Sequence, residues 1–382
     1  MWRCFRLKKI FVFLMLFFVC INNCTYAKEI TDIDSKSYVL MDGFSGEILL
    51  AKNASEKMPP ASITKIMTLL LVMEGIEGGK ISYDDIVTVS ETAAKHEGSH
   101  VFLAVGEQIS VKDLLKAVAV ASGNDAACAL AEHVAGTQER FVSMMNKKAK
   151  SLGMHDTFYE NCNGLDSTNH LTTAKDIAIL TFELSKHKEI FDFTGIWMDT
   201  LREGTFDLAN TNKLIRFYEG ATGMKTGFTS KAGYCLSATA ERNGLSLIAV
   251  VMNASTSQNR FGDASALLNY GFDNYKTVKL CSKNEILSEF PVKKGTVDKI
   301  GAIAENNINI ILSKTEQTEN VVKKIRFKET NAPFKKGTCI GEIKFLIDGR
   351  EVGKTNLLSV ADVKKISFRY CFEHLFKSCI SF

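Results

Sequence analysis

The sequence lacks an apolar run long enough to cross a membrane. Its N-terminal run, Ile10 to Ile21, has about 12 residues, whereas a spanning helix needs roughly 20. Four basic residues precede the run and Thr25-Tyr26-Ala27 follows it. A basic start, a short apolar stretch and a small final residue are typical of a cleaved signal peptide. We therefore expect residues 1–27 to be removed and the rest of the chain to be exported.

The sequence also lacks an excess of charge and a cysteine framework. Without residues 1–27, 43 Lys and Arg balance 43 Asp and Glu, which argues against a nucleic-acid partner. The seven remaining cysteines are odd in number and scattered, so they predict neither a disulfide framework nor a metal site. For each of the seven histidines we expect a solvated or core role rather than metal binding. We expect no metal and no cofactor.

Hydrophobic periodicity predicts an α+β domain over residues 28–275. Two apolar runs flank a turn cluster at 42–46 and indicate a hairpin. Helical spacing follows, and then strand-like runs and one more helical pattern, so the first and last segments should share one sheet with helices around it. The helical patterns cover about 63–74, 111–121, 125–150, 173–187 and 261–270, and the late strand-like runs cover 232–240 and 245–253.

Residues 276–382 show a different sequence pattern. Short β-prone pieces separated by turn residues predict a small all-β domain over residues 276–360. Residues 361–382 combine apolar side chains at helical spacing with charged residues at four-residue intervals, which indicates an amphipathic helix. Such a helix can lie in a membrane surface. The alternative is a helix packed on the β domain.

Ser62-Ile63-Thr64-Lys65 places a hydroxyl and an amine on one face of the first turn of an apolar helix. A lysine that burial holds neutral can take the serine proton and create a nucleophile. The alternative is a serine that only caps the helix. Ser185 and Lys188 repeat the spacing, so this pattern is weak when taken alone.

Two further motifs follow the Ser62 motif along the chain, and their order strengthens the functional interpretation. Ser122-Gly123-Asn124 follows an apolar helical pattern and indicates a loop between helices, where polar side chains can point into a cleft. Lys225-Thr226-Gly227 precedes a strand-like run, where a cation and a hydroxyl could hold a carboxylate and a glycine allows close backbone approach. Its alternative is an ordinary basic turn.

Together the three motifs form the signature of penicillin-binding proteins and class A β-lactamases. Nearly all of the chain after residue 27 resembles the low-molecular-mass D-alanyl-D-alanine carboxypeptidases, which are serine peptidases. The shared blocks are Leu40-Met41-Asp42, Ser45–Leu49, Pro60–Thr68, Ser122–Ala127, Asn163–Asp166, Lys225–Thr229, Gly233–Ala240 and Arg260–Ala264. The chain departs at Cys162, where relatives commonly carry proline, which bears on loop geometry rather than on the chemistry.

The resemblance implies an acyl-enzyme mechanism. Ser62 would attack the carbonyl between the last two D-alanines of a peptidoglycan stem peptide, with Lys65 as the base for acylation. Ser122 would relay a proton to the leaving amine, and Asn124 would bond the substrate amide. The terminal carboxylate of the substrate would bind to residues of the third motif. β-Lactam antibiotics would acylate the same serine, and the enzyme would act at the outer face of the cytoplasmic membrane or in the cell wall.

The resemblance assigns the carboxylate to Lys225 and Thr226, beside Gly227. The backbone N–H groups of Ser62 and Phe228 would hold the oxyanion. Arg260 is a candidate second carboxylate anchor, with an exposed helical arginine in a salt bridge as its alternative.

Three other functions stay open on the sequence alone. A β-lactamase would share the motifs but adds a deacylating carboxylate, which the sequence does not reveal. A D,D-endopeptidase would use the same residues. A non-catalytic wall-binding protein would be expected to lose Ser62 or Lys65, and both are present.

Overall fold

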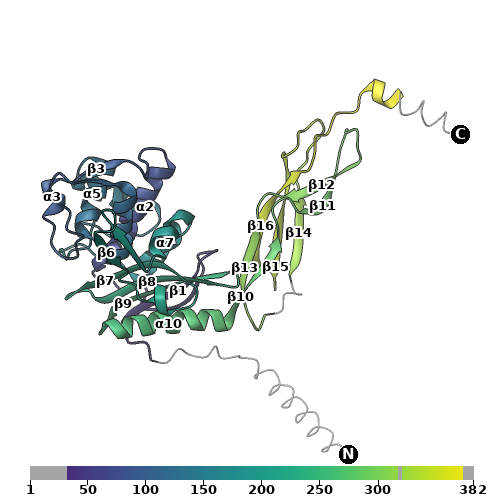
Figure 1. The fold of residues 1–382 in the computed structure, drawn as a ribbon. Helices are drawn as coiled ribbons and strands as arrows, with labels where there is room; N and C mark the ends of the chain where they lie inside the picture. The colour runs from purple at the N-terminus through teal and green to yellow at the C-terminus, as the bar shows by residue number, and fades with distance from the viewer. Residues whose placement is uncertain (1–31, 317–320, 373–382) are drawn as a thin grey trace, which may run out of the picture. The chain divides into compact units, whose positions relative to one another are not determined.

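A computed structural model describes residues 32–316 and 321–372 of the chain (Figure 1). The predicted signal peptide, residues 1–27, lies outside the described residues. The central element is a five-stranded antiparallel sheet in the order β2-β1-β9-β8-β7. The N-terminal hairpin pairs with a late strand, which confirms the prediction of one sheet built from both ends. The strands are β1 (Ser37–Asp42), β2 (Ile48–Lys52), β7 (Ala221–Thr229), β8 (Gly233–Arg242) and β9 (Leu245–Ala254).

Helices cover both faces of this sheet (Figure 1). Val39 and Met41 of β1 belong to the main core, which also contains α7 (Ala174–Leu184) and α2 (Lys65–Glu77). Leu40 points the other way, toward Gly271 of α10 (Ser257–Asn274). This alternation is the period of two that a strand imposes on its side chains. The sheet is therefore buried on both faces.

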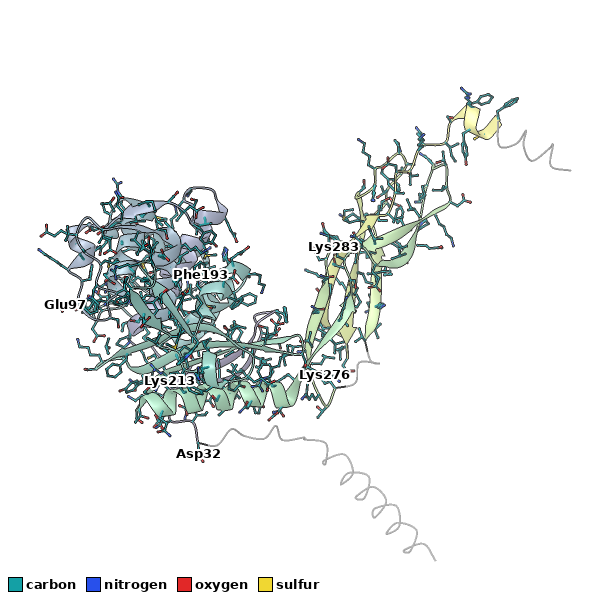
Figure 2. All side chains as sticks on the ribbon, viewed as in Figure 1. Asp32, Glu97, Phe193, Lys213, Lys276 and Lys283 are labelled. Atoms are coloured by element: carbon teal, nitrogen blue, oxygen red, sulfur yellow. The ribbon has the colours of Figure 1, made fainter. Side chains whose placement is uncertain are left out.

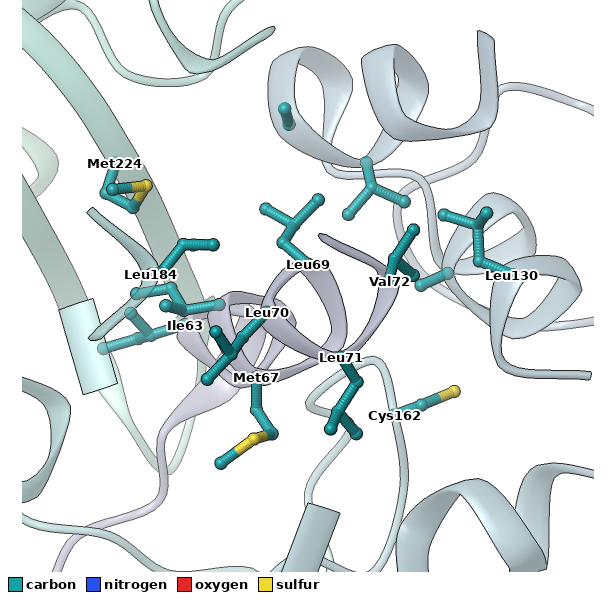
Figure 3. Close-up of a cluster of buried hydrophobic side chains, with 14 of the residues drawn as sticks. Ile63, Met67, Leu69, Leu70, Leu71, Val72, Leu130, Cys162, Leu184 and Met224 are labelled. Carbon is teal, nitrogen blue, oxygen red and sulfur yellow. The ribbon is translucent and has the colours of Figure 1, made fainter. Parts of the chain in front are cut away.

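The helix that follows Ser62 is buried almost all round. Ten of the 13 residues of α2 are buried, and Figure 3 shows Met67, Leu70 and Val72 within the core. A helix that is apolar on every side belongs to the interior of a protein. Because α2 begins at Lys65, this burial also takes the Lys65 side chain out of water.

The remaining helices form a largely helical part around α2. The predicted helix over 125–150 is two helices, because Gly136 ends the first with φ +82° and Thr137 caps the second by accepting from Arg140 N. The elements are η1 (Ala61–Thr64), α3 (Glu91–Ala94), α4 (Val111–Lys116), η2 (Ala117–Ala121), α5 (Asn124–Ala135), α6 (Gln138–Ser151), η3 (Lys188–Ile190), α8 (Phe191–Thr194) and α9 (Leu214–Phe217). Two small antiparallel sheets pair β3 (Ile86–Thr88) with β4 (Gln108–Ser110) and β5 (Met198–Leu201) with β6 (Phe206–Ala209).

From Tyr275 onward the chain is β-rich, as predicted. A second five-stranded sheet has the order β11-β12-β16-β15-β14, and β10 pairs with β13. Phe290, Ile343, Phe345 and Leu357 are buried in its own core. The strands are β10 (Tyr275–Cys281), β11 (Ile286–Pro291), β12 (Lys299–Ala304), β13 (Ile308–Ser313), β14 (Val322–Phe327), β15 (Cys339–Ile347) and β16 (Arg350–Ser359).

The predicted C-terminal helix begins later than expected. Val363 and Lys365 form β-bridges with Phe334 and Gly295, and Val363 is buried in the β-rich core. Helical conformation begins at Phe368 and is described as far as residue 372. A helix starting at residue 361 is therefore wrong, because burial of Val363 fixes this stretch as extended chain. Residues 373–382 lie outside the described residues, and no helix in the described part is long and apolar enough to cross a membrane.

Candidate active site

The candidate nucleophile lies on a strained turn. Ser62 is in η1, directly before α2, and the preceding Ala61 has φ +49°. A left-handed backbone is uncommon for a residue with a side chain and is found where the surrounding structure enforces it. The Ser62 side chain makes no capping bond, and its Oγ instead accepts from Lys65 Nζ at 2.9 Å. The helix-cap alternative is therefore wrong.

Lys65 is fully enclosed by polar partners. Its Nζ donates to Ser62 Oγ at 2.9 Å, Asn124 Oδ1 at 2.6 Å and the Asn163 carbonyl at 2.7 Å. Burial lowers the pKa of this amine to about 7. Near neutral pH a substantial fraction of Lys65 is thus unprotonated and can accept a proton.

The second motif sits between two helices, as predicted. Ser122 has φ +65° and joins η2 to α5, so the chain turns sharply there. Asn124 opens α5, and its amide bridges Lys65 and the carbonyl of Glu97. Figure 2 places Glu97 at the edge of the helical part. The next residue, Asp125, accepts from the backbone N–H groups of Val101 and Leu103, and so holds the adjoining loop.

The third motif lies in the middle of β7, rather than at the start of a strand. Lys225 is only 1% exposed, and its Nζ donates to the Thr226 carbonyl at 3.1 Å. Burial, and then the charges of Lys65 and Arg260, place the pKa of Lys225 well below its usual range. Thr226 Oγ1 donates to Thr211 Oγ1 at 2.7 Å. Because Lys225 has three N–H donors and one protein acceptor, it is equipped to receive an anionic ligand.

Backbone contact joins β7 to the Ser62 turn. A Cβ on Gly227 would lie 3.0 Å from the Pro60 carbonyl oxygen, which is tighter than an ordinary contact, so glycine favours this approach. Phe228 follows on the edge strand, with its ring half exposed and stacked on Tyr234 at 4.3 Å between centroids. The N–H groups named as the oxyanion site thus belong to two segments that touch.

Arg260 is buried, which contradicts the alternative of an exposed arginine in a salt bridge. It is 7% exposed and donates to the carbonyls of Gly227 at 3.1 Å and Cys235 at 3.4 Å. Burial lowers its pKa to about 10. From α10, Arg260 therefore braces the backbone of β7.

Two contributors were missed by sequence reasoning. The Asn163 carbonyl accepts from Lys65, and Asn161 Oδ1 accepts from Gly164 N at 2.7 Å to shape that loop. Thr211 is bonded to Thr226, and its own N–H donates to the Val120 carbonyl at 3.1 Å. The block Asn163–Asp166 carried a signal for the loop, whereas nothing in the local sequence marks Thr211.

Comparisons with known proteins agree with this geometry. Residues 23–256 match the family model described as D-alanyl-D-alanine carboxypeptidase, and residues 275–365 match the C-terminal domain of penicillin-binding protein 5. A D-alanyl-D-alanine carboxypeptidase of Bacillus subtilis is 42% identical over 339 residues, which is 88% of this chain and 87% of that protein.

Solved structures give the same result. Penicillin-binding protein 5 from Haemophilus influenzae is 35% identical with a TM-score of 0.75, covering 87% of this chain and 98% of that chain. Penicillin-binding protein D2 from Listeria monocytogenes, in its ampicillin-bound form, is 33% identical with a TM-score of 0.59, covering 64% of this chain and 100% of that chain. The chain belongs to the D-alanyl-D-alanine carboxypeptidase family, as a serine-type D-Ala-D-Ala carboxypeptidase of the low-molecular-mass, penicillin-binding protein 5 type.

Proposed function

We propose that Ser62 is the acyl-accepting nucleophile and that neutral Lys65 removes its proton. The observation that carries this proposal is the 2.9 Å bond between Lys65 Nζ and Ser62 Oγ, made by an amine with a pKa lowered to about 7. Asn124 and the Asn163 carbonyl hold the amine in place. The serine oxygen attacks the carbonyl between the last two D-alanines of a peptidoglycan stem peptide, D-alanine leaves, and water releases the shortened peptide.

The other groups position the substrate. Lys225 binds the terminal carboxylate, because its buried ammonium has donors left for an anion. Thr226 Oγ1 donates to Thr211 Oγ1 in this structure. If the direction of this bond reverses, the Thr226 hydroxyl hydrogen is free to bind the substrate carboxylate. Asn124 bonds the substrate amide, and Ser122, on the turn before α5, passes a proton to the leaving amine.

The backbone completes the proposed site. The N–H groups of Ser62 and Phe228 stabilise the oxyanion, and Gly227 allows the two segments to approach. Arg260 adds positive charge for the substrate carboxylate and holds the Gly227 carbonyl. All of these residues lie within the proposed peptidase domain, residues 28–275, and β-lactam antibiotics acylate the same serine.

Acylation by a labelled penicillin and release of D-alanine from a pentapeptide test the assignment. We expect Ser62→Ala to abolish both activities. Ser185→Ala is a matched control, because Ser185 has the same spacing to a lysine but its Oγ donates to the Phe182 carbonyl at the end of α7. A penicilloyl adduct mapped to Ser185, or no adduct on the intact protein, contradicts the proposal.

We propose that the C-terminal segment attaches the exported enzyme to the membrane surface. Phe368 is 89% exposed and Phe372 is 61% exposed. The segment leaves from a basic edge, which we define as residues 292–298, 331–336 and 361–366, and hydrogen bonds join the three stretches. The basic edge carries six exposed lysines and two aspartates, so anionic headgroups would attract it while the aromatic rings enter the interface. The lysines are Lys293, Lys294, Lys335, Lys336, Lys364 and Lys365.

Sedimentation with vesicles of phosphatidylglycerol and phosphatidylcholine tests the attachment. We expect binding at low salt, partial release at high salt, and loss of binding when residues 368–382 are deleted. The deletion starts at 368 because Val363 belongs to the β-rich core. Lys335→Glu/Lys336→Glu should weaken binding, whereas the control Lys147→Glu/Lys150→Glu, on exposed positions of α6, should not. Full sedimentation of the deletion variant would refute attachment through this segment.

A further inference from the structure

Two buried thiols lie side by side next to the active site. Cys128 is on α5, and Cys162 is in the loop that precedes Asn163. Their sulfur atoms are 3.5 Å apart, and neither residue is more than 1% exposed. Both are free thiols. No step of the proposed mechanism uses either of them.

The thiol pair is linked to Lys65 through Asn163, by one step along the chain and by hydrogen bonds. Cys162 is the neighbour of Asn163, and the Asn163 carbonyl accepts from Lys65 at 2.7 Å. The Asn163 side chain also donates to Cys128 Sγ at 3.5 Å. The Cys162 carbonyl accepts from Thr68 Oγ1 at 2.6 Å, one turn along α2 from Lys65. A movement of Cys162 toward α5 would therefore be transmitted to one of the three acceptors around Lys65.

We propose that Cys128 and Cys162 form a reversible disulfide that slows acylation of Ser62. The oxidant is a hydroperoxide. One thiol gives up two electrons to the O–O bond and becomes a sulfenic acid, with release of water or an alcohol. The second sulfur then attacks the sulfenic sulfur, a second water leaves, and the S–S bond forms. Two thiol hydrogens are lost, and one hydroperoxide is reduced.

The geometry explains the effect on activity. A disulfide needs a sulfur–sulfur separation of about 2.05 Å, so the atoms must close by roughly 1.5 Å from their present 3.5 Å. A displacement of this size, shared between α5 and the loop, exceeds the tolerance of a hydrogen bond such as that from Lys65 to Asn163. α5 is a regular helix of 12 residues, whereas Cys162 lies in a loop, so we expect the loop to move.

The burial of the two thiols favours a small oxidant. Burial raises the pKa of the Cys128 thiol, which slows its oxidation, and the enclosure of both side chains keeps bulky reagents out. Because hydrogen peroxide is close to water in size, we expect it to reach the pair more readily than an alkylating reagent or a protein disulfide does. Cys235 is an internal comparison, because burial raises its pKa to about 11 but its sulfur contacts backbone groups and no second thiol.

The test compares four proteins after exposure to hydrogen peroxide: wild type, Cys128→Ala, Cys162→Ala and Cys235→Ala. We expect wild type and Cys235→Ala to become about 2 Da lighter, with a peptide that links residues 128 and 162. Their acylation by labelled penicillin should slow at least tenfold and recover with dithiothreitol. Cys128→Ala and Cys162→Ala should form no such link and keep their rate, so loss of one variant to misfolding leaves the other.

Two results would overturn the inference. One is oxygen addition to the cysteines without a 128–162 linkage, which would mean that the sulfur atoms cannot close. The other is a linked protein whose acylation rate is unchanged, which would make the disulfide merely structural. Peptide mapping does not depend on the catalytic assignment, and failure of that assignment would be evident as absent acylation before any peroxide is added.

Discussion

The rate of Ser62 acylation should rise with pH through neutrality. Lys65 must be unprotonated to take the serine proton, and burial lowers its pKa to about 7 from an ordinary value of 10.5. A protonated Lys65 still donates to the serine oxygen but cannot accept. The sign is therefore fixed: a lower pH converts the base into its inactive form, and the rate falls.

The size of the effect follows from the same pKa. With a midpoint near 7, about 90% of Lys65 is neutral at pH 8 and about 10% at pH 6. As long as Lys225 keeps its proton, the acylation rate should thus drop roughly tenfold between these values. Lys225 must keep its proton to hold a carboxylate, and its own pKa lies well below the usual range. We therefore expect the rate to fall again at higher pH, which gives a bell-shaped profile.

The assay is the second-order rate of acylation by a labelled penicillin between pH 5.5 and 9.5. The penicillin carboxylate stays ionised over this range, so only the enzyme titrates. Thermal melts in the same buffers show whether the fold is intact. A rate that is flat between pH 5.5 and 8 would refute Lys65 as the base.

Two further substitutions probe other parts of the site. Lys225→Ala should reduce acylation by a substrate with a free carboxylate about ten- to a hundredfold, and by its amide far less, because a charge-assisted bond of roughly 1.5–3 kcal/mol is lost; equal losses would indicate a purely structural lysine. Gly164→Ala should lower the melting temperature strongly, since its Cβ would lie 2.0 Å from the Ala61 carbonyl oxygen at φ +93°. The control Gly153→Ala, at φ +77° with no atom within 4 Å, should cost only about 1 kcal/mol of backbone strain, and similar effects at both positions would show that the Ser62 turn tolerates the contact.

Local patterns predicted the main sheet and most helices well because their signals are short-range. The 42–46 turn and the strand-like runs that became β8 and β9 each depend on neighbouring residues. The two failures have different causes: a local glycine and cap in the first, and long-range pairing in the second. Gly136 and Thr137 split a continuous helical pattern through backbone geometry and a cap. Val363 has helical spacing, but pairing with Phe334 across about 30 residues holds it extended.

The site was predictable where motif residues provide side chains and unpredictable where the fold provides backbone. Ser62, Lys65 and Asn124 meet as the motif spacing suggested. The Asn163 carbonyl could not be anticipated from its residue type, because any residue carries that oxygen. An arginine on a helix commonly forms an exposed salt bridge, and the sequence offered that alternative for Arg260. In α10 its side chain instead points toward the sheet and donates to two backbone carbonyls there. Topology decides such contacts.

In the proposed mechanism the two buried lysines need opposite charge states, and the structure gives each a different set of partners. Lys65 faces three uncharged oxygens: the neutral amine can donate its two N–H groups to Asn124 Oδ1 and the Asn163 carbonyl and accept from the Ser62 hydroxyl. Lys225 has one carbonyl partner, so its charge remains uncompensated until a carboxylate enters. Because both side chains are buried, a positive charge on one lysine disfavours protonation of the other. The arrangement of lower free energy therefore has one of the two amines protonated and the other neutral. A bound carboxylate stabilises that proton on Lys225 and leaves Lys65 neutral. Substrate binding would in this way prepare the base, which ties recognition of a free carboxyl terminus to activation of Ser62.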